Sequence, residues 1–234
     1  MTSEDFKQHK QVQSIAKETI ECLKPFIKEG LSAKEIKDAA EKIMHEKGIN
    51  NFWYYDIGAF VFVGAETTIS ISGRQYQPSD LQVQSSDLVT VDLSPDFNGC
   101  WGDFSRSFIV ENGKVVDAND SNSPELLEGI EAEKQLHKAF QATITPDTSF
   151  EQAFLKMNSL IEELGFENLD FNKNLGHSIV KHKEDRIYIE AGNKTLFKDV
   201  DLFTFEPHIK RKNGDYGFKH ENIYYFDNEK LKVL

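Results

Sequence analysis

Hydrophobic residues recur at helical spacing at the start of the chain, and strand-like segments follow them. A first helix is expected over about residues 3–29, with Pro25 bending it or ending it early. Ser32 and Glu35 form a capping box, which predicts a second helix that ends at Gly48. Aromatic and β-branched residues then dominate from residue 51 to residue 110 and predict successive strands, in the segments FWYYDIGAFVFVG, TTISISG, LVTVDLS and SRSFIVE.

The same order returns in the second half of the chain. Ser123 and Pro124 predict the start of a helix that runs to about Thr143, and a Thr148–Glu151 capping box predicts another. The strand-like segments IYIEAG, VDLFTFEPHI and HENIYYFDN follow. This repeated order predicts a single α+β domain over residues 1–234, built from two similar halves (about 1–115 and 116–234) that face one another across a groove.

Composition and charge exclude several classes of function. The formal net charge is −12, and phosphate binding needs clustered basic residues, so a nucleic-acid partner is excluded. The polar, acid-containing start MTSEDFKQHK is typical of neither a signal nor a transit peptide, and no apolar run is long enough to cross a bilayer. Two cysteines without Cys-x-x-Cys spacing indicate a reducing compartment. The expectation is a cytoplasmic protein without a membrane partner.

Two aspartates lie in otherwise apolar strand segments. Asp92 ends the most apolar segment, LVTVDLS, and Asp103 follows it across the predicted hairpin turn at residues 96–99. The hairpin would bring the two carboxylates close together. Adjacent buried carboxylates repel unless a cation lies between them. A bound metal ion usually supplies that positive charge.

The second half of the chain supplies three more candidate ligands. His177 lies in NLGHSIV, Glu206 in DLFTFEPHI and Glu221 in FKHENIYYF. Each residue taken alone is more often structural, since ion pairs and loop histidines are common. Four carboxylates and one imidazole together form an oxygen-rich set that suits two divalent ions of the manganese, cobalt, iron or zinc kind.

The order of these motifs carries a resemblance to a known family. VDLSPDFNGCWGDFSRSF, LGHSI, FTFEPH and HENIYYF follow one another as in the pita-bread metallopeptidases, the M24 group that contains methionine aminopeptidase, Xaa-Pro aminopeptidase and prolidase. The resemblance extends from about residue 5 to the end of the chain. It implies the pita-bread fold, in which two pseudo-symmetric helix-helix-strand halves surround a curved antiparallel sheet.

The resemblance also implies a role for each candidate ligand. Asp92 resembles the terminal ligand of one metal ion, and Asp103 and Glu221 resemble the bridging carboxylates. His177 and Glu206 would complete the other ion. Glu206 would also act as the general base toward a hydroxide that bridges the two metals.

The chain departs from the family at two substrate-site histidines. Gln75, followed by Tyr76, stands where the family has the first, and a glutamine cannot act as an acid. Glu184 stands where the second is expected, and His182 lies two positions earlier as a candidate for its catalytic role. The residues expected to bind substrate are Gln75, Tyr76, Arg106 and His208.

The function implied is a metal-dependent exopeptidase that acts on a peptide or dipeptide. The WGDFSRSF segment, with Arg106 after the second aspartate, favours the Xaa-Pro branch, whereas the chain length is nearer to that of a methionine aminopeptidase. A non-catalytic binding protein of the same fold and a metal-independent hydrolase of the creatinase kind are hypotheses from different classes. Retention of all five ligands argues against both. The expected state is a monomer or a homodimer.

Overall fold

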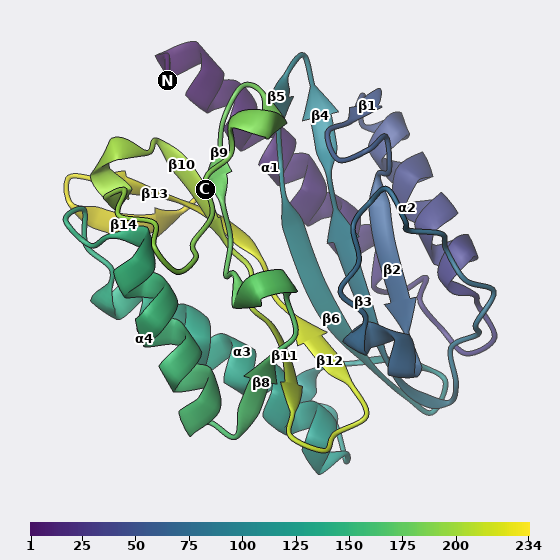
Figure 1. Ribbon diagram of the computed structural model, residues 1–234. Coiled ribbons are helices and arrows are strands. Elements are labelled where there is room, and N and C mark those ends of the chain that lie inside the picture. The colour runs from purple at the N-terminus through teal and green to yellow at the C-terminus, as the bar shows by residue number, and fades with distance from the viewer.

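The computed structural model describes residues 1–234, and its elements follow the order helix-helix-strands twice (Figure 1). The helices are α1 (Ser3–Leu23), α2 (Ala33–Glu46), α3 (Pro124–Thr143) and α4 (Phe150–Glu163). The strands are β1 (Asn51–Phe52), β2 (Ala59–Val63), β3 (Ser86–Leu93), β4 (Pro95–Phe97), β5 (Cys100–Trp101), β6 (Phe104–Glu111), β7 (Lys114–Val116), β8 (Phe166–Asn168), β9 (Ser178–Ile179), β10 (Leu202–Phe205), β11 (His208–Arg211), β12 (Gly217–Lys219), β13 (Asn222–Asp227) and β14 (Lys230–Val233). Short 3-10 turns are η1 (Gly64–Thr68), η2 (Ala118–Asp120), η3 (Phe171–Lys173), η4 (Lys183–Asp185) and η5 (Phe197–Asp199).

Capping residues define where the helices begin. The predicted Ser32–Glu35 capping box is confirmed at the start of α2. The predicted Thr148–Glu151 box is wrong, because Ser149 caps α4 and Gln152 returns the second hydrogen bond. Thr148 instead accepts a hydrogen bond from the backbone N–H of Thr145, in the turn before the helix.

The first helix is shorter than expected. It ends at Leu23 rather than near residue 29, since Pro25 lacks the N–H that the next turn of the helix would need. In α3 the predicted start at Ser123 and Pro124 is confirmed. None of the helices is apolar over a length sufficient to cross a membrane.

The strands form antiparallel sheets that the two halves supply separately. The first half gives a four-stranded sheet in the order β2-β3-β6-β7 and a small sheet β1-β4-β5. The second half gives β14-β13-β10-β9 and β12-β11-β8. The predicted hairpin joins β4 to β5 through Asn98 and Gly99, whose φ angles are +55° and +79°. A two-residue turn with positive φ at both positions matches the twist of the strands that it joins.

Two segments that were expected to be strands are not. Residues 67–73 (TTISISG) begin inside η1 and then run without a partner strand, leaving Ile69 and Ile71 exposed. Residues 187–192 (IYIEAG) contribute a single bridge, between Tyr188 and His177. A turn closed by the hydrogen bond from the Asn193 N–H to the Glu190 carbonyl ends that pairing.

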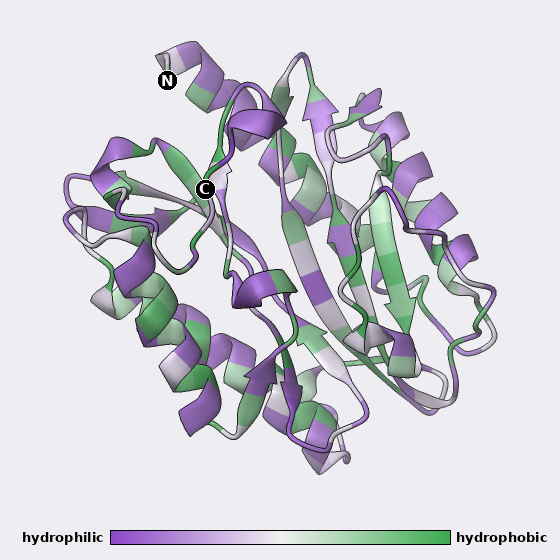
Figure 2. Cartoon of the chain, viewed as in Figure 1, coloured by the Kyte–Doolittle hydropathy of each residue, from purple (hydrophilic) through white to green (hydrophobic).

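The helices cover the outer sides of the strands. Figure 1 shows α1 and α2 beside the sheet of the first half, and α3 and α4 beside the strands of the second half, in keeping with the contacts of α2 with β2 and of α4 with β8. In Figure 2 strand β2 is mainly hydrophobic, whereas the helices show hydrophilic bands beside hydrophobic ones. Two large apolar clusters result, one within the first half and one mainly in the second half that also includes Leu88 and Ile109 of the first-half sheet, and the strands of the two halves meet between the helix pairs.

Candidate metal centre

A cavity of about 180 Å³ lies among the strands and loops where the two halves meet. Its lining includes four of the five predicted metal ligands, namely Asp92, Asp103, His177 and Glu206. A larger hollow of about 1000 Å³ lies between α1, β6 and α3, and none of the predicted metal ligands lines it. The chemistry expected from the sequence therefore belongs to the smaller cavity.

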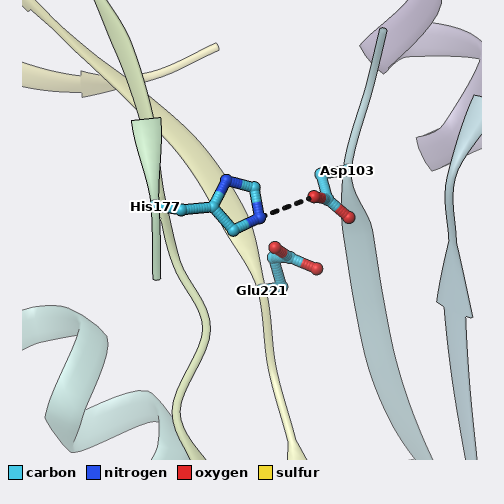
Figure 3. A group of neighbouring side chains, drawn as sticks. All are labelled: Asp103, His177 and Glu221. Carbon is cyan, nitrogen blue, oxygen red and sulfur yellow. Dashed lines mark ion pairs between the residues drawn. The ribbon is translucent and has the colours of Figure 1, made fainter. Parts of the chain in front are cut away.

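Asp103, His177 and Glu221 form a compact buried group (Figure 3). One ligand atom from each of the three lies within 4.8 Å of the other two. The Nε2 atom of His177 is 3.4 Å from Oδ2 of Asp103 and 3.6 Å from Oε1 of Glu206. The three side chains come from segments that are far apart in the sequence, and they point toward one another.

The carboxylate of Glu221 shows that this group fits a cation. Glu221 is fully buried, and neither of its oxygens has a hydrogen-bond partner. Burial raises its pKa well above the usual value, and the charges of Asp103 and Glu206 raise it further. Burial and the charge of Asp92 likewise raise the pKa of Asp103 to about 6, although His177 opposes that shift. A cation bound among these side chains would compensate such a cluster and would give the Glu221 oxygens a partner.

Lys219 forms ion pairs with the other two predicted acidic ligands, Asp92 and Glu206. Lys219 Nζ lies 2.5 Å from Oδ2 of Asp92 and 3.1 Å from Oε2 of Glu206. Burial alone would lower the pKa of Lys219, but the carboxylates of Asp92 and Glu206 raise it well above the usual value. Burial alone would raise the pKa of Glu206, but Lys219 and His177 outweigh it and lower that pKa.

Hydrogen bonds between elements set the positions of these side chains. Gln13 on α1 accepts a hydrogen bond from the backbone N–H of Asp103 and donates one to its carbonyl, at 2.9 and 2.8 Å. The N–H of His177 donates to Thr204 Oγ1 at 3.0 Å. The N–H of Glu221 donates to the carbonyl of Ser105 at 3.0 Å and so joins the second half to β6.

Aromatic rings and a second cation form the rest of the wall. Trp53, Tyr54, Phe60, Phe62 and Tyr188 line the cavity together with Arg186 and Asp170. The Arg186 guanidinium lies 4.7 Å from the ring centroid of Trp53, and its Nε–H donates to the carbonyl of Lys183 at 2.7 Å. Burial and the charge of Glu206 raise the pKa of Asp170 to about 6.

The other residues predicted for the site are dispersed. His208 lines the cavity, where its Nε2 lies 2.7 Å from the carbonyl of Thr67, and burial lowers its pKa to about 4. Gln75 and His182 are exposed and do not line the cavity. Tyr76 is buried, and its hydroxyl bonds to the backbone of Val61.

Arg106 lies on the other side of β6 from the predicted metal ligands. It lines the larger hollow and donates to the carbonyl of Glu221 at 2.7 Å and to Asn222 Oδ1 at 2.8 Å. Since Asp103 and Ser105 precede it at alternate positions, strand alternation directs Arg106 away from the cavity.

The sequence motifs match a family model over nearly the whole chain. The model is that of metallopeptidase family M24, and it matches residues 7–228. The chain belongs to metallopeptidase family M24. The α+β pita-bread fold expected from the resemblance is confirmed. A search of curated proteins found no match.

Solved structures of M24 enzymes have the same fold as this M24 chain. The prolidase from Thermococcus sibiricus superimposes with a TM-score of 0.80 at 20% identity, over 99% of this chain and 59% of the prolidase. The prolidase from Pyrococcus horikoshii gives 0.83 at 18% identity, over 99% and 62%. Methionine aminopeptidase from Rickettsia prowazekii gives 0.75 at 17% identity, over 100% and 97%. The chain thus spans about three fifths of the length of these prolidases and nearly all of the aminopeptidase.

Several residues of the site were not foreseen from the sequence. Lys219 stands two positions before Glu221, a spacing that places both on one face of an extended segment, so alternation alone could have found it. Gln13, Asp170 and Arg186 gave no comparable signal, because each reaches the site only through contacts with distant parts of the chain.

Proposed function

We propose that this M24 chain is an exopeptidase that uses two divalent metal ions, held by Asp92, Asp103, His177, Glu206 and Glu221, to hydrolyse an N-terminal peptide bond. The observation that carries the proposal is the buried carboxylate of Glu221, which has no partner and faces Asp103 and His177. When bound, the metal ions would activate water and polarise the scissile carbonyl. Manganese, cobalt, iron and zinc all suit this set of ligands.

Glu206 is the proposed general base. A base must be ionised before it can accept a proton, and the lowered pKa of Glu206 keeps it so at neutral pH. Its Oε1 receives a hydrogen bond from Thr204 Oγ1 at 3.4 Å, and its Oε2 faces Lys219. These contacts orient the carboxylate toward the cavity beside His177.

The cavity supports a small peptide substrate. Its volume of about 180 Å³ suits one or two residues, and the aromatic side chains of Trp53, Tyr54 and Phe60 offer apolar surface for them. We assign the cleaved bond to the Xaa-Pro type, with prolidases among the structures of this fold as support. Methionine aminopeptidase activity is the second candidate, and the near-complete overlap with the Rickettsia prowazekii enzyme favours it.

Hydrolysis of a defined set of peptides tests the proposal. Purified protein supplied with manganese, cobalt or zinc should cleave Xaa-Pro dipeptides faster than Met-Ala-Ser. Glu206→Gln should reduce kcat by at least about a hundredfold, since a general base typically contributes two to four orders of magnitude. Glu46→Gln, at an exposed position on α2, is the matched control and should keep full activity.

The outcomes of that test separate the candidates. Preference for Met-Ala-Ser would select methionine aminopeptidase activity. Metal binding without cleavage of either peptide would contradict the peptidase assignment. Unchanged turnover in Glu206→Gln would contradict its role as base.

A further inference from the structure

Two cations from different halves of the chain meet at the ring of Tyr55. Lys183, in η4 of the second half, has its Nζ atom 4.5 Å from the ring centroid. Arg74, in the first half, has its guanidinium carbon 5.4 Å from the same centroid and donates from Nε to the Tyr55 hydroxyl at 3.0 Å. Arg74 is exposed, and Lys183 and Tyr55 are half-buried. These three residues are called the cationic rim below.

The cationic rim adjoins the cavity that holds the candidate metal centre. The ring centroids of Tyr54 and Tyr55 lie 4.8 Å apart, and Tyr54 lines the cavity. Lys183 Nζ also donates to the carbonyl of Trp53 at 3.4 Å, and Trp53 is a second lining residue. The rim therefore lies within reach of a peptide whose N-terminal residues fill the cavity.

The backbone that presents Tyr55 is strained. Tyr55 and Asp56 have φ angles of +57° and +58°, in the left-handed region that bulky side chains rarely adopt. Gly73 lies directly against the tyrosine rings, since a Cβ atom there would be 2.6 Å from Tyr55 and 3.1 Å from Tyr54. Strained backbone of this kind persists only where the surrounding structure imposes it, and it is concentrated at functional sites.

The two cations of the rim have no acidic partner. Their side-chain nitrogens donate only to neutral oxygens, the hydroxyl of Tyr55 and the carbonyl of Trp53, and neither cation forms an ion pair with the neighbouring Asp56. The two terminal NH₂ groups of Arg74 donate no hydrogen bond within the protein. Unpaired cations in a chain of net charge −12 attract anions that the rest of the surface repels. Their free donors suit a carboxylate, which arginine and lysine bind through charge-assisted hydrogen bonds.

We propose that Arg74 and Lys183 form a binding site for a carboxylate on the residue that follows the first two residues of a peptide substrate. That carboxylate is an acidic side chain or a free C-terminus. The inference deepens the proposed exopeptidase function and rests on its placement of the N-terminal residues in the cavity. A neutral third residue with an amidated end would leave both cations to the solvent and would gain no such contact.

Hydrolysis of matched peptides tests the inference. The metal-loaded wild type is given Ala-Pro-Glu-amide and Ala-Pro-Gln-amide, which differ in one charge and lack a C-terminal carboxylate. The value of kcat/KM should be about fivefold higher for the glutamate peptide, as expected for one partly exposed ion pair. Because salt screens exposed charges, the preference should shrink at about 0.5 M NaCl. Ala-Pro-Gln with a free C-terminus measures the other source of the carboxylate, and the same three peptides beginning with Met-Ala cover the second candidate activity.

Variants of the rim locate the effect. Arg74→Gln combined with Lys183→Met should reduce the preference for the glutamate peptide to less than about twofold, whereas Lys183→Arg keeps the charge and should keep the preference. Lys181→Met, at an exposed position in the same loop, is the matched control and should keep the wild-type preference. Circular dichroism checks the fold of each variant. A purely structural role for the two cations would lower kcat/KM equally for all peptides and leave the preference intact.

The outcomes separate this inference from the proposed peptidase function. Equal kcat/KM for the three peptides, or a preference that the double variant retains, would overturn the inference and leave the function standing. A preference limited to the free C-terminus would uphold the site and identify the terminus as its ligand. If the wild type cleaves none of the peptides, calorimetric titration with the same peptides replaces the kinetics. Tighter binding of the charged peptides, lost in the double variant, would then uphold the inference and contradict the function, and no binding would contradict both.

Discussion

The side chain of Gln13 holds the backbone of Asp103 by two hydrogen bonds, one accepted and one donated, across 90 positions of sequence. Gln13 is completely buried on α1, and Asp103 lies between β5 and β6. The amide of Gln13 satisfies a backbone donor and a backbone acceptor beside a candidate metal ligand. The first helix therefore contributes directly to the geometry of the site.

Replacing Gln13 should weaken both the fold and the metal site. Gln13→Ala leaves the N–H and the carbonyl of Asp103 buried without partners, and we expect a loss of roughly 2–4 kcal/mol in the free energy of unfolding. Affinity for Mn²⁺ should fall with it, because Asp103 loses its support. Denaturant unfolding and metal titration measure the two effects. Gln11→Ala, exposed on the same helix, is the control, and equal behaviour of the two variants would contradict the role of Gln13.

Metal binding should stabilise the protein through Glu221. At a hundredfold excess of Mn²⁺ over Kd, a site present only in the folded state adds about 2.7 kcal/mol. For a chain of this size that corresponds to roughly 5–10 °C in Tm. Glu221→Gln should lose most of this shift, since an amide supplies no negative charge to the ion.

The chelated protein provides the complementary measurement. At pH 8 chelated Glu221→Gln should be at least as stable as the chelated wild type, because it removes a buried carboxylate that has no partner. Glu167→Gln, on the partly exposed strand β8, should keep the full metal-induced shift. A full shift in Glu221→Gln would remove this residue from the metal site.

Arg186 should favour substrates with a free carboxylate. Its guanidinium is held against Trp53 and Tyr54 in the cavity wall, and only its Nε–H bonds to the protein. Arg186→Met should lower kcat/KM for a dipeptide by about tenfold to a hundredfold, as expected for loss of a charge-assisted hydrogen bond. The same dipeptide with a C-terminal amide should lose little.

The test compares kcat/KM for the dipeptide with a free C-terminal carboxylate and for the same dipeptide with a C-terminal amide. Lys181→Met, exposed in the same loop, should leave both substrates unaffected. An equal loss for the acid and the amide in Arg186→Met would mean that Arg186 supports the cavity wall rather than binding a carboxylate.

His137 should make the protein less stable in acid. Burial lowers its pKa to about 3, while its Nδ1 lies 2.7 Å from the hydroxyl of Tyr224. Below pH 6.5 the unfolded chain binds a proton that the folded chain does not, so stability is complete above that pH and falls as the pH drops toward 3. Between pH 6.5 and pH 5 the loss from this group is about 2 kcal/mol.

A variant isolates this contribution from the other titrating groups. In His137→Gln the free energy of unfolding should change less steeply between pH 7 and pH 5 than in the wild type, whatever its absolute value. His45→Gln, at an exposed position on α2, should keep the wild-type slope. An unaltered slope in His137→Gln would contradict the lowered pKa.

Local chemistry explains what could be predicted about the fold. The capping box of Ser32 and the turn at Asn98 and Gly99 act over three or four residues, so their effect is visible in the sequence. The neighbouring Ser149 and Thr148 show the limit of such local prediction. Both can cap a helix, and the contacts of the preceding turn decide which one does.

Strands depend on partners that the sequence does not display. The alternation in residues 67–73 is as regular as that of true strands, yet no partner strand lies beside that segment, and residues 187–192 pair with residues 175–178 only over their first three positions. A strand is stable only when its backbone groups are paired. Periodicity therefore predicts which face would be buried, but not whether a neighbour exists.

The sequence by itself determined the family, the repeated order of helices and strands, and the acidic residues and histidine that are the candidate metal ligands. Only the tertiary structure decided that Lys219 pairs with Asp92 and Glu206, that Gln13 supports Asp103, and that Arg106 faces away from the cavity. The physical reason is that a side chain's charge and shape are local properties, whereas its partner depends on how distant strands and helices pack together. Burial then decides how strongly each charge acts.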